Sequence, residues 1–187
     1  FMKSILFYSI LWLGFSSTCL AQMTFRDITQ AAGLSGVSGS SSIAVGDFNN
    51  DGYEDFYLGF PAKKNQLWKN LGDGRFSEMA ETAGVALAIS SDTKTAIWGD
   101  IDNDGDLDLY VGNNVNPDKL FRNNGNETFT DITTAAGIFQ LGYPLSVNMA
   151  DVNRDGFLDI YVSNFNQENV LYLNNGNGTF TNRTLQS

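Results

Sequence analysis

Three short acidic segments contain the residues of this sequence whose types and spacing could do chemistry. Each follows the pattern D-x-[DN]-x-D-G-x-x-D, over residues 47–55, 100–108 and 151–159. Side-chain oxygens at positions 1, 3 and 5 can converge on one point when the chain curls, and the glycine at position 6 permits the sharp turn. Such a shell suits a hard cation such as Ca²⁺, which takes six to eight oxygen ligands. We therefore expect up to three Ca²⁺ ions, one in each acidic loop.

Oxygen ligands are available at five positions of each loop. Positions 1, 3, 5 and 9 carry carboxylate or amide oxygens, whereas position 7 is too varied to act through its side chain and is assigned through its backbone carbonyl. An EF-hand shares the opening of this pattern but needs a bidentate Glu at position 12 and flanking helices. Position 12 is instead Leu58, Val111 or Val162, so the loop closes at position 9 inside a β-hairpin. The predicted metal ligands are Asp47, Asn49, Asp51, Tyr53, Asp55, Asp100, Asp102, Asp104, Asp106, Asp108, Asp151, Asn153, Asp155, Phe157 and Asp159.

The three loops are expected to differ in affinity. Asp, Asn and Gly are also ordinary turn formers, but three loops in register, each with carboxylates at positions 1, 5 and 9, favour metal binding. The sequence favours Ca²⁺ and leaves Mg²⁺ and Mn²⁺ open. The second loop has acidic side chains at all four of positions 1, 3, 5 and 9, whereas Asn49 and Asn153 stand at position 3 of the others. We predict that the second loop binds most tightly, with Asp104 among its ligands.

Aromatic and turn residues recur with the same period as the acidic loops. Phe25, Phe76, Phe129 and Phe180 follow one another at steps of 51, 53 and 51 residues, and an Asn/Gly-rich turn precedes each of the last three. Self-similarity at a fixed period is the signature of a repeat architecture, here with a period of roughly 52 residues. The repeats cover approximately residues 37–85, 86–138 and 139–187.

Each repeat contains four segments that are typical of short strands. A segment of small and apolar residues precedes the acidic loop, a β-rich run follows it, a third segment comes next, and the Asn/Gly turn leads into a fourth at the recurring phenylalanine. Four antiparallel strands are the unit of a β-propeller blade. We therefore predict an all-β fold, an incomplete β-propeller of three blades. The predicted strands cover 42–45, 55–58, 66–68, 95–98, 108–111, 119–121, 146–149, 159–162 and 170–172, with a lone strand at 25–29 and brief helix-compatible stretches at 29–32 and 133–136.

Residues 1–21 are typical of a signal peptide. Lys3 gives a short positive region, residues 5–15 form an apolar run, and the end of the segment, Cys19 to Ala21, places small residues before a cleavage site. The run is shorter than the roughly 20 residues that span a bilayer, so cleavage after Ala21 is favoured over a retained anchor or a lipoprotein formed through Cys19. The remaining region, 22–187, is predicted to be secreted or to lie at the cell surface or in the periplasm, with no stable membrane span.

The composition excludes several classes of function. The chain has 21 acidic and 11 basic residues, a net charge of −10, so it lacks the basic face that nucleic-acid binding needs. It has no histidine and one cysteine, which excludes histidine-based triads, His/Cys zinc sites and internal disulfides. Apolar residues make up 42% of the chain, enough for a packed core. Any ion that binds is therefore expected to be held by oxygen.

Residues 96–113, 120–125 and 129–133 together resemble the FG-GAP/VCBS-type repeat, which occurs in the integrin α-subunit propeller and in secreted bacterial proteins related to the ASPIC/UnbV group. The resemblance extends over essentially all of residues 25–187. It implies a calcium-bound β-propeller used for adhesion, recognition or scaffolding outside the cytoplasm. Propellers typically close with four to eight blades, and this chain has three repeats. We therefore expect either a fragment of a longer protein or a short chain that closes by self-association.

The predicted function is that of a non-enzymatic, calcium-binding module for extracellular recognition, adhesion or scaffolding. Its partner is expected to be an extracellular protein or polysaccharide, bound by connecting loops, because scaffold-held loops are where binding residues tend to lie. One alternative is part of a propeller-based extracellular enzyme that acts on polysaccharide, since propellers host many chemistries. Another is a bare structural repeat inside a larger enzyme or adhesin. An acid and base for catalysis would have to come from Glu54, Glu78, Glu81 or Asp131.

The large aromatic residues are interpreted as packing residues. Trp98 stands where the other repeats have Val45 and Met149, and we expect it in the core. Trp68, Phe121 and Tyr172 occupy equivalent positions of the three repeats, which favours packing between blades over a ligand platform.

Overall fold

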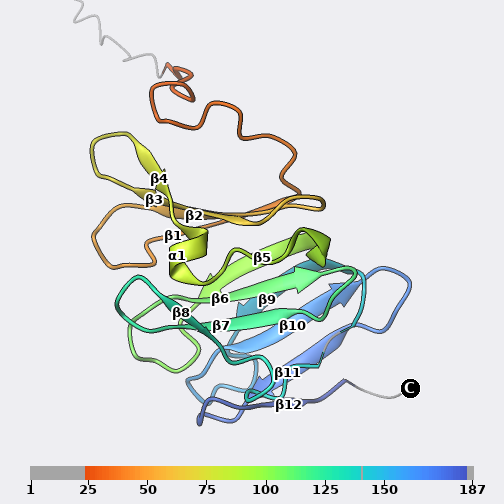
Figure 1. Ribbon diagram of the computed structural model, residues 1–187. Coiled ribbons are helices and arrows are strands. Elements are labelled where there is room, and N and C mark those ends of the chain that lie inside the picture. Colours follow the sequence, from red (N-terminus) through yellow and green to blue (C-terminus); the bar gives the residue numbers. More distant parts are fainter. Residues whose placement is uncertain (1–23, 140, 185–187) are drawn as a thin grey trace, which may run out of the picture.

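The computed structural model describes residues 24–139 and 141–184, which form three antiparallel sheets of four strands each (Figure 1). Within each sheet the strands follow chain order, so every strand is hydrogen-bonded to its neighbour in sequence. The first sheet contains β1 (Ser42–Gly46), β2 (Asp55–Gly59), β3 (Gln66–Asn70) and β4 (Phe76–Glu78). The second contains β5 (Thr93–Gly99), β6 (Asp108–Asn113), β7 (Lys119–Asn123) and β8 (Phe129–Asp131). The third contains β9 (Pro144–Ala150), β10 (Asp159–Asn164), β11 (Val170–Asn174) and β12 (Phe180–Asn182).

The two kinds of turn in each sheet explain why the strands are short and regular. The acidic loop joins the first strand to the second, and the Asn/Gly turn joins the third to the fourth. Gly52, at position 6 of the first acidic loop, has a φ of 87°, and Gly72 in the Asn/Gly turn has a φ of 72°. Both values lie in the left-handed region that glycine adopts without steric cost. The repeated glycines therefore fix where each hairpin reverses.

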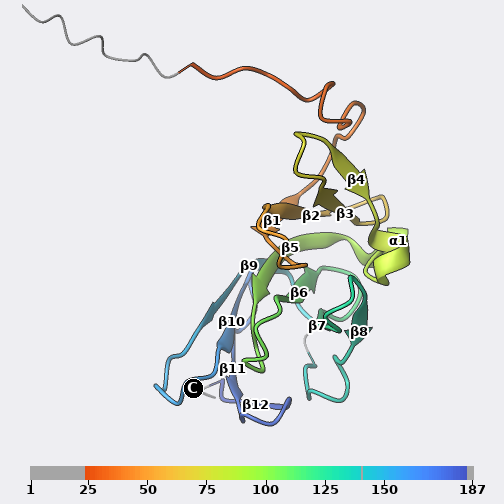
Figure 2. The same ribbon diagram turned by 90° about the vertical axis from the view of Figure 1, so that its left-hand side faces the viewer.

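The three sheets are arranged as successive blades whose first strands are neighbours. β1 contacts β5, and β5 contacts β9, and Figure 2 shows these three strands side by side at the centre of the molecule. The blades stack face to face, with one apolar cluster between each adjacent pair. This arrangement is that of consecutive propeller blades.

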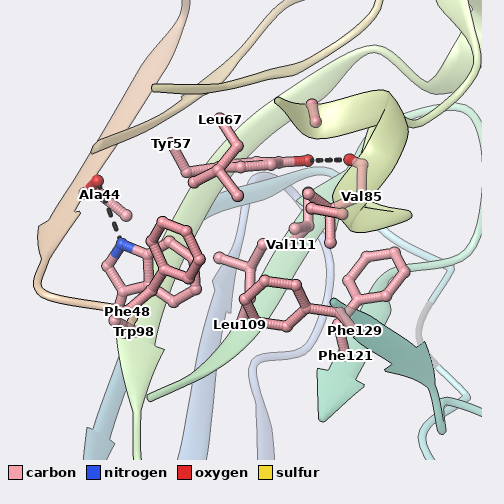
Figure 3. Close-up of a cluster of buried hydrophobic side chains, with 12 residues drawn as sticks. Ala44, Phe48, Tyr57, Leu67, Val85, Trp98, Leu109, Val111, Phe121 and Phe129 are labelled. Carbon is pink, nitrogen blue, oxygen red and sulfur yellow. Dashed lines mark hydrogen bonds between the residues drawn. The ribbon is translucent and has the colours of Figure 1, made fainter. Parts of the chain in front are cut away.

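The cluster between the first and second blades shows how neighbouring blades are joined (Figure 3). Trp98 of β5 packs against Phe48 at a ring distance of 6.1 Å and donates from its indole Nε1 to the carbonyl of Ala44, at 3.2 Å. The hydroxyl of Tyr57 donates to the carbonyl of Val85 at 2.9 Å, tying β2 to the connection between the blades. Trp98 is buried, so its assignment to the core is confirmed.

An asparagine at the end of the third strand makes polar contacts between blades in two of the three repeats. The side-chain amide of Asn123 in the second blade donates to the carbonyl of Phe48 in the first, at 2.7 Å. Asn174 in the third blade donates in the same way to the carbonyl of Ile101 in the second, at 2.8 Å. Asn70 holds the equivalent position in the first blade, and its amide donates to the carbonyl of Glu54 in its own blade.

The structure confirms the predicted strands and corrects three local expectations. The lone strand expected at 25–29 is not formed, and Phe25 is 98% exposed. A strand needs a neighbouring strand for its backbone hydrogen bonds, and none of the described residues forms one beside this segment. The stretches at 29–32 and 133–136 form turns instead of helices, whereas an unexpected helix, α1, spans Ala80–Ala83.

The aromatic residues at the equivalent position of the third strand are all buried in apolar clusters: Trp68, Phe121 and Tyr172. Phe121 and Tyr172 pack between blades as predicted, whereas Trp68 packs with Leu34 and Val37 of the segment that precedes the first blade. The predicted signal peptide, residues 1–21, lies outside the described residues. Among the residues that are described, no helix has the length and apolar character needed to cross a membrane.

A buried acid replaces an amide at one position of the repeat. Asn65 and Asn169 each accept a backbone N–H and donate to the hydroxyl of a tyrosine on the second strand. In the second blade the residue is Asp118, which accepts from the backbone of Asn113 at 2.8 Å and from the hydroxyl of Tyr110 at 2.6 Å. Burial raises the pKa of Asp118 from its ordinary 3.8 to about 6, although both hydrogen bonds oppose the shift.

We expect Asn123→Ala to lower the free energy of unfolding by about 1–3 kcal/mol, because the buried carbonyl of Phe48 and the partly buried carbonyl of Leu107 lose their donor. Chemical denaturation in dilute solution measures this change. Asn70→Ala is the matched control: it removes the same side chain at the same repeat position but no contact between blades. Equal losses in the two variants would contradict a role for Asn123 in joining the blades.

We expect Asp118→Asn to stabilise the chain increasingly as the pH rises from about 4 to about 6. The folded chain holds its proton on Asp118 up to about pH 6, whereas the unfolded chain releases it near the ordinary pKa of 3.8, so native stability falls across this window. The asparagine variant does not titrate and can adopt the bonds seen at Asn65 and Asn169. Melting temperatures measured from pH 4 to 7 should diverge, and a constant difference would contradict the raised pKa.

Candidate metal centre

The first aspartate of each acidic loop caps the turn that follows it. In the second loop, Asp100 accepts the backbone N–H of Asp104 at 3.1 Å and that of Gly105 at 3.0 Å, one on each carboxylate oxygen. Asp47 and Asp151 accept the equivalent pairs in the first and third loops. These bonds curl each loop around its first aspartate.

The aspartate at position 9 is buried and joins the loop to the rest of its blade. Asp108 accepts the N–H of Ile101, at the start of the loop, at 3.0 Å and the N–H of Asn123, at the end of β7, at 2.8 Å. Asp55 and Asp159 make the same two bonds in their blades. Burial raises the pKa of Asp55 to about 6 and that of Asp108 to about 7, against the opposing effect of the two N–H donors.

The second loop brings three carboxylates together. One oxygen from each of Asp100, Asp102 and Asp108 lies within 4.8 Å of the others. Oδ1 of Asp102 is buried and has no hydrogen-bond partner. Burial, together with the neighbouring charges of Asp104 and Asp100, raises the pKa of Asp102. A buried acceptor without a donor, beside two further carboxylates, fits a cation with oxygen ligands.

In the first and third loops, position 3 is an asparagine whose side chain bonds to the aspartate at position 5. The amide of Asn49 donates to Asp51 at 2.9 Å, and the amide of Asn153 donates to Asp155 at 2.8 Å. A neutral amide therefore donates to the aspartate at position 5 in these two loops, whereas the second loop has a further carboxylate, Asp102, at position 3. In the first loop, Asn49 also donates to Glu127 of the second blade, and Glu127 forms an ion pair with Lys69.

The predicted ligands at positions 5 and 7 lie at the outside of the loops. The aspartates at position 5 are exposed, and each accepts the backbone N–H of position 7, as Asp104 does from Asp106 at 2.9 Å. The rings of Tyr53 and Phe157, at position 7, lie against the glycines of the Asn/Gly turns. These side chains turn away from the loop interior, which is consistent with a ligand role for the backbone carbonyl only.

The acidic loops of successive blades lie side by side. The amide of Asn50, at position 4 of the first loop, donates to the carbonyl of Gly105, at position 6 of the second, at 3.3 Å. Asn103 donates in the same way to Gly156 of the third loop at 2.9 Å. The three candidate sites therefore form one row along the same edge of the stacked blades.

Sequence reasoning missed the residues that support the loops from outside. The asparagine at the end of each third strand, Asn70, Asn123 or Asn174, was assigned only to a turn, yet its backbone N–H binds the aspartate at position 9. Its recurrence at a fixed distance after each loop was the signal that could have found it. Glu127 has no counterpart in the other repeats, and only the fold brings it next to Asn49.

Comparison with known proteins places these features in a family. Relatives named cartilage acidic protein 1 match over 146 residues at 30% identity in Xenopus tropicalis and in Homo sapiens, covering 76% of this chain and 22% of each relative. The protein of that name from Mus musculus is 28% identical over 167 residues, 79% of this chain and 24% of the relative. The chain thus spans about a quarter of the length of these relatives or less.

A family model for the FG-GAP-like repeat matches three overlapping segments, residues 48–111, 100–162 and 151–187. The first two matched segments each extend from one acidic loop to the second strand of the next blade, and the third extends from the last acidic loop to residue 187. The matches together cover well over half of the chain, in the same three-fold pattern as the blades. The chain belongs to the family of FG-GAP-like repeat proteins.

Proposed function

We propose that this chain is a calcium-binding, non-catalytic module for recognition outside the cell. The observation that supports it most strongly is the buried, unpartnered Oδ1 of Asp102 among the carboxylates of Asp100 and Asp108. Carboxylates held at such short range repel one another, and a divalent cation relieves both this repulsion and the unsatisfied acceptor.

Ca²⁺ fits these loops better than the smaller Mg²⁺. A loop with side-chain and backbone oxygens from five positions can supply the six to eight ligands of Ca²⁺, whereas Mg²⁺ retains several waters and is held by one or two carboxylates. The second loop, with Asp102 in place of an asparagine, is proposed as the tightest of three sites. The residues proposed as its ligands are Asp100, Asp102, Asp104, the carbonyl of Asp106 and Asp108.

An extracellular location is proposed from two independent features. The N-terminal segment has the pattern of a signal peptide, and the relatives carry a name that refers to cartilage. Millimolar Ca²⁺ suits loops of this kind, because extracellular modules bind with dissociation constants of about 10⁻⁴–10⁻³ M.

The recognition surface is proposed at the edge opposite the acidic loops. There the connection between the second and third strands meets the linker that enters the same blade, as in the bond from the N–H of Phe165 to the carbonyl of Tyr143. Large apolar side chains are exposed along this edge, and exposed apolar patches commonly mark interaction sites. They are Ile89, Val115, Leu141, Tyr143 and Phe165.

A non-catalytic role is proposed because the candidate acids have separate local partners. Glu78 accepts the N–H of Ala80, Glu81 forms an ion pair with Lys64, and Asp131 forms one with Lys119. Each of these contacts thus holds a carboxylate to a local donor, and Glu54, the fourth candidate, is exposed.

Exchanging the residue at position 3 between loops should exchange their affinities. Asp102→Asn is expected to weaken the tightest Ca²⁺ site by roughly tenfold or more, because it removes a charged ligand. Asn153→Asp should strengthen the third site. Calorimetric titration measures both changes, and Asp73→Asn, a loss of charge outside the loops where Asp73 pairs with Arg75, is the matched control. An unchanged tightest site in Asp102→Asn would contradict the assignment.

Partner binding should depend on the apolar edge and not on exposed aromatic residues elsewhere. In millimolar Ca²⁺ the chain is expected to bind members of an array of extracellular matrix proteins and polysaccharides, and Phe165→Ser should lose that binding while its melting temperature is unchanged. Phe25→Ser, at the N-terminal end of the described residues, is the control. Release of reducing sugar ends from a polysaccharide would contradict the non-catalytic proposal.

A further inference from the structure

A tyrosine hydroxyl on the second strand ties the first blade to the connection that leads into the second. The hydroxyl of Tyr57 donates to the carbonyl of Val85 at 2.9 Å and accepts from the side-chain amide of Asn65, also at 2.9 Å. Because the amide supplies its own proton to this contact, the proton of the hydroxyl is left for the carbonyl. All three residues are buried, and the bond from Tyr57 to Val85 lies within the apolar cluster between the two blades (Figure 3).

The second blade has the same parts, but its tyrosine hydroxyl points elsewhere. Tyr110 occupies the position of Tyr57, and its hydroxyl donates to Oδ2 of Asp118 at 2.6 Å. Ile138 is the counterpart of Val85, since the N–H of each bonds to the carbonyl five residues earlier. A hydroxyl has one proton, so Tyr110 cannot donate to the carboxylate and to the carbonyl of Ile138 at once. The aspartate therefore holds the proton that would tie β6 to the connection into the third blade.

The two oxygens of Asp118 have different partners inside the fold. Oδ1 accepts the N–H of Asn113 at 2.8 Å, whereas Oδ2 faces the hydroxyl of Tyr110. The side chain is completely buried. Oδ2 is therefore the oxygen on which a proton would change the bonding, because a protonated carboxyl donates where a carboxylate only accepts.

The groups around Asp118 leave its own protonation as the event that can redirect this hydrogen bond. Burial raises the pKa of the Tyr172 hydroxyl on β11, and the charge of Asp118 adds to that shift, so this tyrosine stays neutral. Two ion pairs border the loop that carries Asp118: Lys119 with Asp131, and Lys94 with Asp92. Burial is the main cause that raises the pKa of Asp118 to about 6.

We propose that protonation of Asp118 moves the hydroxyl of Tyr110 onto the carbonyl of Ile138, so that acid adds a hydrogen bond between β6 and the connection into the third blade. A proton from solvent binds Oδ2 of Asp118, and the new O–H donates to the oxygen of Tyr110, as the amide does in the first blade. The hydroxyl proton of Tyr110 then turns to Ile138 and stays on its own oxygen throughout. The junction between the first two blades keeps its bond at every pH, because Asn65 does not titrate.

Nuclear magnetic resonance of the full chain in millimolar Ca²⁺, from pH 4 to pH 8, tests this switch. Labelling the isoleucine carbonyls with ¹³C and the phenylalanine nitrogens with ¹⁵N selects one peptide bond, because Ile138–Phe139 is the one Ile-Phe pair in the sequence. The carbonyl signal of Ile138 should move downfield as the pH falls, with a midpoint near pH 6. The carbonyl of Val85, selected in the same way through its bond to Ala86, is the internal control and should not move.

Two variants distinguish transfer of the hydroxyl from the electric field of a nearby charge. Asp118→Asn should hold the Ile138 carbonyl at its acidic position at every pH, since the asparagine can donate to the tyrosine as Asn65 does. Tyr110→Phe leaves an acid that still titrates but removes the hydroxyl, so the response should disappear.

The proposal is overturned by an Ile138 signal that does not respond to pH in the unaltered chain, or by a response that persists in either variant. Asp118→Asn places in the second blade the residue that the first and third blades already have at this position, so the test stands on this variant alone if Tyr110→Phe does not fold.

Discussion

The rest of each blade depends on the pair of hydrogen bonds that a buried aspartate accepts at the end of the acidic loop. Asp55, Asp108 and Asp159 each bind one N–H at the start of the loop and one at the end of the third strand. The loop and the strand it must contact are thereby held by the same carboxylate. Burying that charge is unfavourable, as the raised pKa values of Asp55 and Asp108 indicate, and a cation in the loop would offset this penalty.

The same loops also set how blades meet. Position 4 of one loop donates to the glycine of the next, and the asparagine that binds the closing aspartate extends its side chain to the preceding blade. Loop conformation and blade stacking are therefore coupled through a few shared residues. Apolar packing of Trp98 on Gly46 and of Met149 on Gly99 then fills the space between the sheets. A cation that orders one loop would for this reason stabilise the contact with its neighbour.

Most of the fold follows from the sequence because its determinants are local and repeated. Glycines in the two turns and β-rich runs between them were enough to predict every strand of the three blades and the residues of the second-loop cluster. The prediction was wrong at 25–29, where the strand pattern is present but no strand within residues 24–139 and 141–184 pairs with it. The contacts of Asn123 with Phe48 and of Glu127 with Asn49 join residues more than 70 apart, so only the stacking of blades reveals them.

The most direct test of this account is amide hydrogen exchange with and without Ca²⁺. The two N–H groups held by each closing aspartate should exchange more slowly when Ca²⁺ is present, in all three blades. The N–H of Asn113, which binds Asp118 at the opposite edge, serves as an internal reference and should respond less. Exchange at the loop amides that is unchanged by Ca²⁺ would contradict the claim that these loops are metal sites on which the blades depend. The amides to follow are those of Phe48, Asn70, Ile101, Asn123, Val152 and Asn174.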